Sequence, residues 1–252
     1  MSPATPIVSL RGVRKRVGSV DILNGVTFEV GRGETVYLMG PSGSGKTTTL
    51  RTINGLSGID SGAIIVDGEP VRAHESRAPD QALLALRRKV GMVFQQFNLF
   101  AHRTVLQNVA MPLIHLRGHA AAEARPAARA LLARPGRDHR ADTYPGALSS
   151  GQQQRVAFAR TLVLEPRILL LDEVTASLDP EAKKTVCGLI AELAAGGVTC
   201  IMVTHEAGWI REHMGRVLFM DHGAVVESGP ARTFFTAAQD ARTRGFLGAL
   251  VT

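Results

Sequence analysis

The chain has 252 residues, of which 45% are hydrophobic and 20% are charged, and its formal net charge is +7. This composition excludes an intrinsically disordered chain, and the length fits one large domain or one domain with a smaller lobe. No apolar run reaches the roughly 18 to 20 residues that span a bilayer, and residues 1–12 lack the features of a signal peptide, so we expect a soluble chain.

The positive charge comes mainly from arginine and is compatible with nucleic acid or with an anionic membrane surface. The arginines are scattered, and no basic and aromatic platform for nucleic-acid bases is present. The two cysteines, Cys187 and Cys200, form no spaced pattern and fall in segments that look helical or strand-like. They predict reduced thiols in a cytosolic protein.

Short runs rich in aliphatic and β-branched residues predict strands along most of the chain. In chain order these strands are expected at 26–30, 34–39, 89–94, 167–172, 198–204 and 216–221. Helical patterns separate several of them. The sequence therefore predicts an α/β fold with helices covering a parallel sheet, and with an antiparallel portion near the N-terminus.

The segment after the strand at 34–39 matches the phosphate-loop pattern G-x-x-x-x-G-K-[ST]. It consists of Gly40, Pro41, Ser42, Gly43, Ser44, Gly45, Lys46 and Thr47. Glycines let successive N–H groups face phosphate oxygens, and the start of the following helix adds partial positive charge. Lys46 is predicted to bridge the outer phosphates and Thr47 to ligate magnesium, with Thr48 also at the nucleotide. A simple Gly/Ser-rich turn is disfavoured because strand, G-K-T and helix occur together.

The region from about Thr104 to Tyr144 has a different composition, because alanine, leucine and arginine dominate and strand patterns disappear. It predicts an inserted helical lobe. Pro126 and Pro135 are expected to limit the helices inside it, with a break near 131–137, because proline disrupts a helix interior.

The apolar run 168–171 ends in two adjacent carboxylates, Asp172 and Glu173. A buried strand ending in this way can direct Asp172 toward the metal through water and Glu173 toward an attacking water. Such a pair can also simply cap the next helix. After a phosphate loop, the catalytic interpretation is favoured.

The phosphate loop, LSSGQQQR at 148–155 and LLLDEVTASLD at 169–179 together resemble the ATP-binding subunit of ABC transporters, over nearly the whole chain. The segments 90–109 and 225–247 are similar to those of polar amino acid importers, although phosphonate and other small-solute importers are similar in the same places. The resemblance implies a P-loop NTPase core with a mixed sheet, an N-terminal antiparallel β portion and an inserted helical lobe. It further implies a single domain, 1–252, with a catalytic core at 1–96 and 155–252 and a helical subdomain at 97–154.

The resemblance also assigns residues outside the phosphate loop. Gln95 is similar to the glutamine that contacts magnesium and the attacking water, and His205 to the histidine at the terminal phosphate. Taken alone, each is an ordinary polar residue after a strand. Asp179 resembles the residue that reports across a dimer interface, although Leu-Asp-Pro is also a common helix start.

The residues Ser149, Ser150, Gly151 and Gln152 resemble the loop that binds the terminal phosphate held by a second subunit. A helix start with a serine hydroxyl and exposed N–H groups is an anion receptor that needs no metal or base. Two copies would thus sandwich two ATP molecules. A serine N-cap alone would explain Ser149 but not the run GQQQR.

Three positions depart from the family pattern. Ser150 stands where glycine is usual, so its side chain is expected to crowd the phosphate or disfavour a left-handed backbone, at about 1 kcal/mol. Val17 replaces the aromatic that stacks on adenine in the nucleotide site, which costs on the order of 1 kcal/mol, partly compensated by Arg16. Tyr37 lies within a predicted strand and is a poor substitute. Val174 stands where proline is common, with no predicted effect.

The resemblance therefore implies an ATPase that uses ATP and Mg2+ to drive uptake of a small polar solute, expected to be an amino acid. Its implied partners are a second copy of itself, permease subunits at the cytoplasmic face of the inner membrane, and indirectly a periplasmic or lipid-anchored solute-binding protein. The exposed apolar segment within 97–109 would receive a permease helix, or it packs between the lobes.

Two other functions stay open at this point. A soluble ABC ATPase acting in translation or DNA repair fits the positive charge, but such chains carry two nucleotide domains or a long coiled coil, so no nucleic-acid partner is expected. A non-catalytic binding module is supported only by Ser150 and Val17. Retention of the charge-handling residues argues for an active enzyme; these are Lys46, Thr47, Gln95, Asp172, Glu173 and His205.

Overall fold

The computed structural model describes residues 5–71, 81–133 and 140–249. An antiparallel four-stranded sheet has the order β2-β1-β4-β5. Its strands are β1 (Val8–Val17), β2 (Val20–Val30), β4 (Ser61–Val66) and β5 (Glu69–Pro70). This sheet is the antiparallel portion that the sequence predicts near the N-terminus.

A second, six-stranded sheet has the order β10-β9-β3-β8-β7-β6. Its strands are β3 (Thr35–Met39), β6 (Val90–Val93), β7 (Ile168–Asp172), β8 (Thr199–Val203), β9 (Arg216–Asp221) and β10 (Ala224–Pro230). Neighbours from β6 to β9 pair in parallel, and β10 pairs antiparallel to β9. The predicted α/β class is confirmed. Five of the six predicted strands lie in this sheet, and the sixth, 26–30, lies within β2, whereas β10 was not predicted.

The central strands of this sheet are buried on both faces, as their uninterrupted apolar runs require. In β7, Ile168 and Leu170 belong to a first core cluster, which also contains residues of α1 (Lys46–Ile53) and of the antiparallel sheet. Leu169 and Leu171 belong to a second cluster with residues of α6 (Pro180–Ala195) and α7 (Ala207–Glu212). The segment 40–47 and the segment that follows Asp172 thus extend from a sheet that is buried on both faces.

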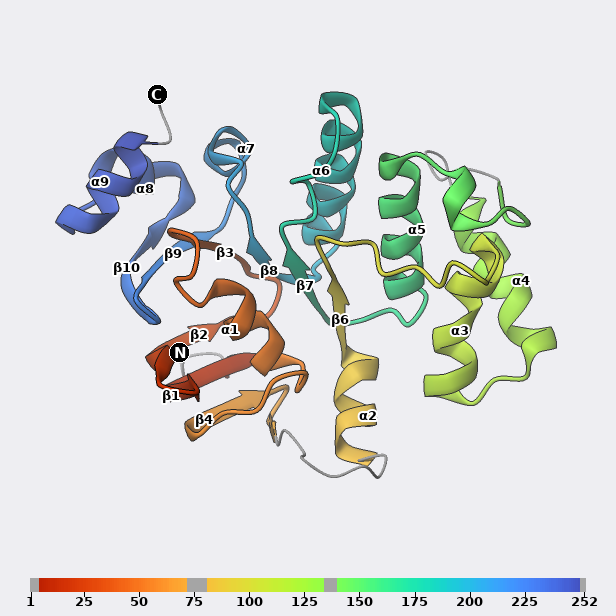
Figure 1. Cartoon of the computed structure of the whole chain (residues 1–252), viewed down its shortest axis with the longest axis horizontal. Coiled ribbons are helices and arrows are strands. Elements are labelled where there is room, and N and C mark those ends of the chain that lie inside the picture. The colour runs from red at the N-terminus through yellow and green to blue at the C-terminus, as the bar shows by residue number, and fades with distance from the viewer. Residues whose placement is uncertain (1–4, 72–80, 134–139, 250–252) are drawn as a thin grey trace.

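A third apolar cluster joins the helices α3 (Val105–Arg117), α4 (Ala121–Leu132) and α5 (Ser150–Leu162). Figure 1 shows these helices grouped at one end of the molecule, with α8 (Ala231–Ala237) and α9 (Ala241–Ala249) at the opposite end. The short helix η1 (Pro145–Ala147) precedes α5, and α2 (Gln81–Lys89) leads into β6. None of the described helices is long and apolar enough to cross a bilayer.

The prediction that Pro126 limits a helix is wrong, because α4 continues through it. Ala124, Ala128 and Leu132 form a buried stripe of α4 that packs in the third cluster. Burial of this stripe outweighs the interior proline, whose missing hydrogen bond and ring clash together cost about 3 kcal/mol. Pro135 lies outside the described residues, and α4 ends at Leu132, where the predicted break begins.

The two cysteines are free, as the sequence predicts. Cys187 lies on α6 and Cys200 on β8, and both are buried. Burial raises the pKa of Cys187 to about 11 and that of Cys200 to about 12. Both thiols are therefore protonated and unreactive at neutral pH.

Candidate functional site

The phosphate loop connects β3 to α1 and lies against the end of β9. Gly40 has a φ of 143°, and a Cβ added there would lie 2.0 Å from the carbonyl oxygen of Met220. Only glycine allows this close approach. Ser44 and Lys46 are buried, whereas Ser42 and Gly43 are exposed. The loop thus has a fixed base and an exposed tip.

The ammonium group of Lys46 folds back into this loop. Its Nζ donates to the carbonyl oxygens of Gly40 and Pro41 at 2.8 and 2.7 Å. Burial lowers the pKa of Lys46, and the carboxylates of Glu173 and Asp172 oppose that change. A phosphate oxygen on the loop would offer this ammonium a charged acceptor in place of neutral ones, which strengthens the hydrogen bonds.

The first turn of α1 meets the end of β7 through a side-chain hydrogen bond. The hydroxyl of Thr47 donates to Asp172 Oδ1 at 2.7 Å. Asp172 is only 5% exposed, and burial raises the pKa of its carboxyl group. A hydroxyl and a carboxylate side by side are hard oxygen donors, so this pair fits Mg2+. Thr48 follows in the same turn and is half-buried.

The strand register places Gln95 at the same sheet edge. Val93, the last residue of β6, pairs with Leu171, which immediately precedes Asp172. Gln95 follows two residues later and is exposed. An amide at this edge can turn toward a metal bound between Thr47 and Asp172.

Glu173 and His205 meet at the carboxyl ends of neighbouring strands. Glu173 Oε1 lies 3.4 Å from His205 Nε2, and the backbone N–H of Glu173 donates to the carbonyl oxygen of Val203 at 3.0 Å. Glu173 has a φ of 48°, a left-handed conformation that costs a side-chain-bearing residue roughly 1 to 2 kcal/mol. Strain of this kind concentrates at functional sites. The carboxylate of Glu173 faces the ring of His205.

The segment Ser149–Gln152 forms a capped start of α5. Ser149 accepts a hydrogen bond from the Gln152 N–H, and the Gln152 side chain accepts one from the Ser149 N–H at 2.9 Å. The serine hydroxyl is therefore an N-cap, as the simpler interpretation proposed. Ser150 is the first helical residue of α5 and does not have positive φ. The expectation that Ser150 strains a left-handed backbone is wrong, because no left-handed residue is needed at a helix start.

Gly151 permits close contact between α5 and α6. A Cβ added to Gly151 would lie 2.7 Å from the Cβ of Ala182. Asp179 is the N-cap of α6, and its Oδ1 accepts from the N–H of the same Ala182 at 2.9 Å. The Ser149–Gln152 segment and Asp179 thus meet at one helix junction. Val174, before this junction, is buried in the second core cluster.

This junction is separate from the phosphate loop of the same chain. In Figure 1, α5 and α1 lie on opposite sides of β6 and β7. The structure therefore brings together the phosphate loop, Asp172, Glu173 and His205, and it leaves the start of α5 elsewhere.

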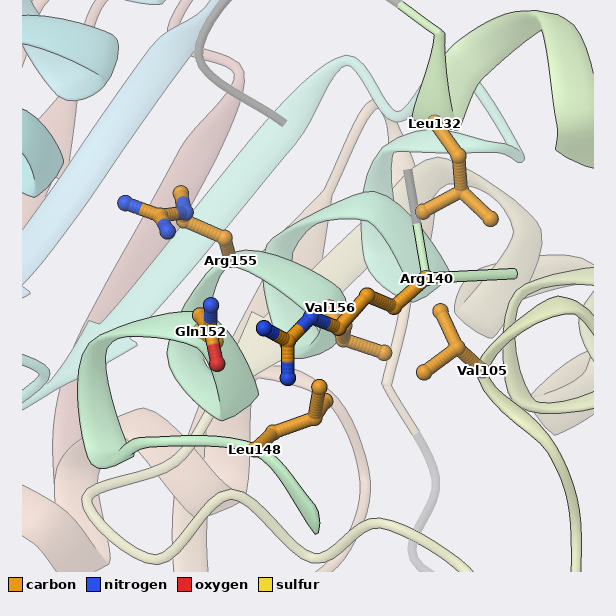
Figure 2. A pocket seen from close by; sticks show the side chains of 7 residues that line it. All are labelled: Val105, Leu132, Arg140, Leu148, Gln152, Arg155 and Val156. Atoms are coloured by element: carbon orange, nitrogen blue, oxygen red, sulfur yellow. The ribbon is translucent and has the colours of Figure 1, made fainter. Parts of the chain in front are cut away.

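A small cavity lies under the start of α5. Figure 2 shows Arg140 reaching across it, with the guanidinium between Gln152 and Leu148. Val105, Leu132 and Val156 also line it, with Arg155 at its edge. The cavity volume is about 10 Å³, which accommodates about one water molecule and no larger ligand. It belongs to the packing of the helical group.

The residues near the expected adenine site are exposed. Val17 ends β1 opposite Val20 and is 59% exposed. The guanidinium of Arg16 pairs with Asp21 through two hydrogen bonds, of 2.6 and 3.1 Å. Tyr37 is buried in β3 and donates to the carbonyl oxygen of Met214 at 3.3 Å. The prediction that Tyr37 is no substitute for an adenine-stacking ring agrees with this burial.

Two side chains that the sequence analysis did not single out hold the segment after Gln95. Arg160 of α5 donates to the carbonyl oxygens of Asn98 and Phe97 at 2.6 and 3.1 Å. The buried amide of Asn108 accepts from the N–H of Phe100 at 2.8 Å and donates to its carbonyl oxygen at 3.1 Å. An amide inside the apolar helix pattern at 105–113 is the sequence feature that could have identified Asn108.

The side chains of the apolar segment 97–100 differ in burial. Phe97 and Leu99 pack against the core clusters, whereas Phe100 is 42% exposed. Packing between the lobes therefore explains the first two side chains. Phe100 is the most exposed apolar side chain of this segment.

The fold and the loop geometry define a P-loop nucleotide-binding protein. A family profile described as "ABC transporter" matches residues 23–176. The chain belongs to the ABC transporter family, and it is an ATPase with the cassette fold.

Two relatives are named as ATP-binding proteins of glutamate and of L-cystine transport. The glutamate transport ATP-binding protein GluA of Corynebacterium glutamicum is 44% identical over 245 residues, covering 97% of this chain and 99% of the relative. The L-cystine transport system ATP-binding protein TcyN of Escherichia coli is 42% identical, covering 95% of this chain and 96% of the relative.

A solved structure has the same fold. It is a dimeric ATP-binding cassette in a post-hydrolysis state bound to ADP and Pi, with 34% identity and a TM-score of 0.76, covering 89% of this chain and 99% of that one. That cassette is a dimer with bound nucleotide products.

Proposed function

We propose that this chain is the ATP-hydrolysing subunit of an importer of a small polar solute, an amino acid. It works as a pair of copies on membrane-embedded permease subunits, peripheral to the cytoplasmic face of the membrane. A solute-binding protein outside the membrane delivers the solute, and no nucleic acid takes part. The names of the relatives support the solute class.

One observation carries this proposal: the phosphate loop, Asp172, Glu173 and His205 converge at one sheet edge, while Ser149–Gln152 lies on another helix. The start of α5 does not face the phosphate loop of its own chain, so it can bind phosphate when a second copy supplies the nucleotide. In a pair of copies related by two-fold symmetry, the start of α5 in each copy faces the phosphate loop of the other. Asp179, beside the start of α5, then lies at the contact between the copies.

In the proposed mechanism the loop N–H groups and Lys46 bind the phosphates, and Val17 lies beside the adenine. Thr47, Asp172 and Gln95 would hold Mg2+, which would neutralise phosphate charge. Glu173 accepts a proton from the attacking water. The oxygen of that water bonds to the terminal phosphorus as the bond to ADP breaks and ADP leaves. His205 donates a hydrogen bond to that phosphate and keeps Glu173 oriented.

The helical group is the proposed coupling lobe, comprising 97–154, with 1–96 and 155–252 as the catalytic core. Phe100 and the surface of α3 face the permease. Arg160 and Asn108 fix the segment after Gln95, so a displacement of that segment moves α5 and its N-terminal residues.

The test replaces the proposed base. Glu173→Gln with Mg-ATP is expected to abolish phosphate release and to accumulate an ATP-bound dimer, because the amide accepts no proton. Size-exclusion chromatography with bound-nucleotide analysis measures both. Glu192→Gln, an exposed position on α6, is the matched control and is expected to behave as the unmodified chain.

Near-normal hydrolysis by Glu173→Gln would remove Glu173 as the base. Failure to pair in Mg-ATP, with or without the permease, would overturn the sandwich. Stimulation of hydrolysis by solute in the purified complex tests the importer assignment. Salt-sensitive binding to nucleic acid would instead favour the soluble alternative.

A further inference from the structure

The carboxylate of Glu206 connects three segments that surround the proposed catalytic pair. Its Oε1 accepts a hydrogen bond from the hydroxyl of Thr175 at 3.3 Å and lies 2.8 Å from Nζ of Lys183. Thr175 follows β7, Glu206 follows β8, and Lys183 lies in the second turn of α6. The side chain of Glu206 is 33% exposed, so it is partly shielded from water.

The Thr175–Glu206 contact joins the same two segments as the Glu173–His205 pair. Thr175 follows Glu173 by two residues, and Glu206 immediately follows His205. The two strand-end segments are therefore joined twice, at 3.4 Å between Glu173 and His205 and at 3.3 Å between Thr175 and Glu206. The first junction involves a 44% exposed histidine, whereas Thr175 in the second is buried. The second junction is the better shielded anchor for the loop.

The backbone around Glu206 gives the loop little freedom. The Glu206 N–H donates to the hydroxyl of buried Thr204 at 3.1 Å, and its carbonyl oxygen accepts from the N–H of Ile210 at 3.1 Å. Holding the Glu206 side chain thus fixes the adjacent His205 backbone. A displaced His205 would have to break the Glu206 contacts or distort the start of α7.

Lys183 makes this arrangement electrostatically acceptable. Without it, the carboxylate of Glu206 would be an unpaired charge in a partly shielded site, which is costly. Lys183 lies four residues after Asp179, which caps α6. Its ion pair therefore links the His205 loop to the helix whose start meets Gly151.

We propose that Glu206 is a positioning residue that holds His205 at Glu173, with Lys183 as its counter-charge. It thereby makes the placement of His205 depend on the segment between Glu173 and α6. The inference rests on the proposed function, since it assigns a role in hydrolysis. It differs from the sandwich proposal because its contacts lie within one chain.

The first test measures ATPase kinetics of the permease complex carrying Glu206→Ala, Glu206→Gln or Lys183→Met. Glu206→Ala is expected to lower kcat about tenfold with KM for ATP unchanged, because the phosphate loop is intact. Glu206→Gln keeps an acceptor for Thr175 but loses the ion pair, so its loss and that of Lys183→Met should be smaller. Glu212→Gln, exposed on α7, is the control.

A double-mutant cycle separates positioning from general stability. In the His205→Ala background, Glu206→Ala is expected to change the residual kcat by less than about twofold, because no histidine remains to be placed. Effects that multiply in the two backgrounds would overturn the proposal.

A spectroscopic readout works on the isolated chain and needs no hydrolysis. The His205 ring signal, identified by its loss in His205→Ala, should move in Glu206→Gln toward its position in Glu173→Gln. An unchanged signal would overturn the proposal. If the unmodified complex does not hydrolyse ATP, the proposed function fails, and this spectrum still decides whether Glu206 positions His205.

Discussion

Thr47 and Asp172 are joined by a 2.7 Å hydrogen bond that ties the first turn of α1 to the end of β7. The bond crosses 125 residues of sequence and brings both proposed metal ligands to one point. Because Asp172 is buried and burial raises its pKa, the same carboxylate that suits a metal destabilises the nucleotide-free fold.

The first prediction follows from these two opposite effects of the Asp172 carboxylate, on metal binding and on stability. Asp172→Asn is expected to raise the Tm of the nucleotide-free protein near neutral pH, because the amide still accepts from Thr47 and carries no buried charge. ATP turnover should fall by more than about 100-fold, since lost metal binding removes several kcal/mol of transition-state stabilisation. Differential scanning fluorimetry and phosphate release measure the two effects.

The direction in which the Tm increase of Asp172→Asn changes with pH follows from the raised pKa of Asp172. Burial raises the pKa of Asp172, so the stabilisation from protonation is fully present below the unfolded-state value, 3.8, and lost as pH rises through the raised pKa. The Tm advantage of Asp172→Asn should therefore shrink as the pH is lowered from neutral through the raised pKa toward 3.8. Asp142→Asn, whose side chain is 80% exposed, is the control, and a lower Tm for Asp172→Asn at neutral pH would contradict the argument.

The junction between α5 and α6 gives the second prediction. Gly151→Ala places a Cβ 2.7 Å from that of Ala182, so the helices must separate. Overpacking of this kind costs typically 1 to 3 kcal/mol, and urea unfolding should show it. Turnover should fall with it, because the start of α5 is displaced.

Gly188→Ala is the matched control for this substitution. Gly188 lies in α6, and beyond the backbone of its own helix no atom lies within 4 Å of an added Cβ. Alanine there should stabilise the helix by up to about 1 kcal/mol. Equal effects of the two substitutions would show that Gly151 is not required for close packing.

The sequence predicts the parts of this fold that depend on local pattern. The run at 168–171 is uninterrupted and apolar, and it lies in a central strand with both faces buried. β1 escaped prediction because RGVRKRV interrupts its apolar positions with charges, which face solvent. The prediction that Pro126 limits a helix failed because the unfavourable free energy of an interior proline is visible in the local sequence. The burial of α4 that outweighs it depends on tertiary packing.

The candidate site likewise has residues that local sequence motifs identify and contacts that they do not. The phosphate loop and the Asp172–Glu173 pair are contiguous motifs, and motif chemistry identifies them. The contacts of Glu206 reach across 31 residues to Thr175, and those of Arg160 across 62 to Asn98. No local pattern encodes such contacts, because their partners are set by the strand order.

The third prediction concerns the adenine site. Val17→Tyr is expected to tighten ATP binding by up to about fivefold, because a ring on the exposed end of β1 can stack on the base for on the order of 1 kcal/mol. Val17→Leu adds apolar bulk without a ring face and should give no gain. Calorimetry with Mg-ATP compares the three proteins, and a Tyr variant no better than the Leu variant would contradict stacking at Val17.

The fourth prediction concerns Ser150, where backbone strain is no longer an explanation because the residue is helical. Crowding of the partner's phosphate remains, so Ser150→Gly is expected to raise turnover of the assembled transporter by up to about fivefold. Glycine should lower the Tm slightly, because it weakens a helix by up to about 1 kcal/mol.

Ser150→Ala identifies which atoms cause the crowding. Alanine keeps the Cβ and removes the hydroxyl, so a rate near that of the unmodified chain would assign the crowding to the Cβ. A rate near that of the glycine variant would assign it to the hydroxyl. If Ser150→Gly turns over no faster than the unmodified chain while its dimer still forms, the start of α5 accommodates the side chain and crowding is excluded.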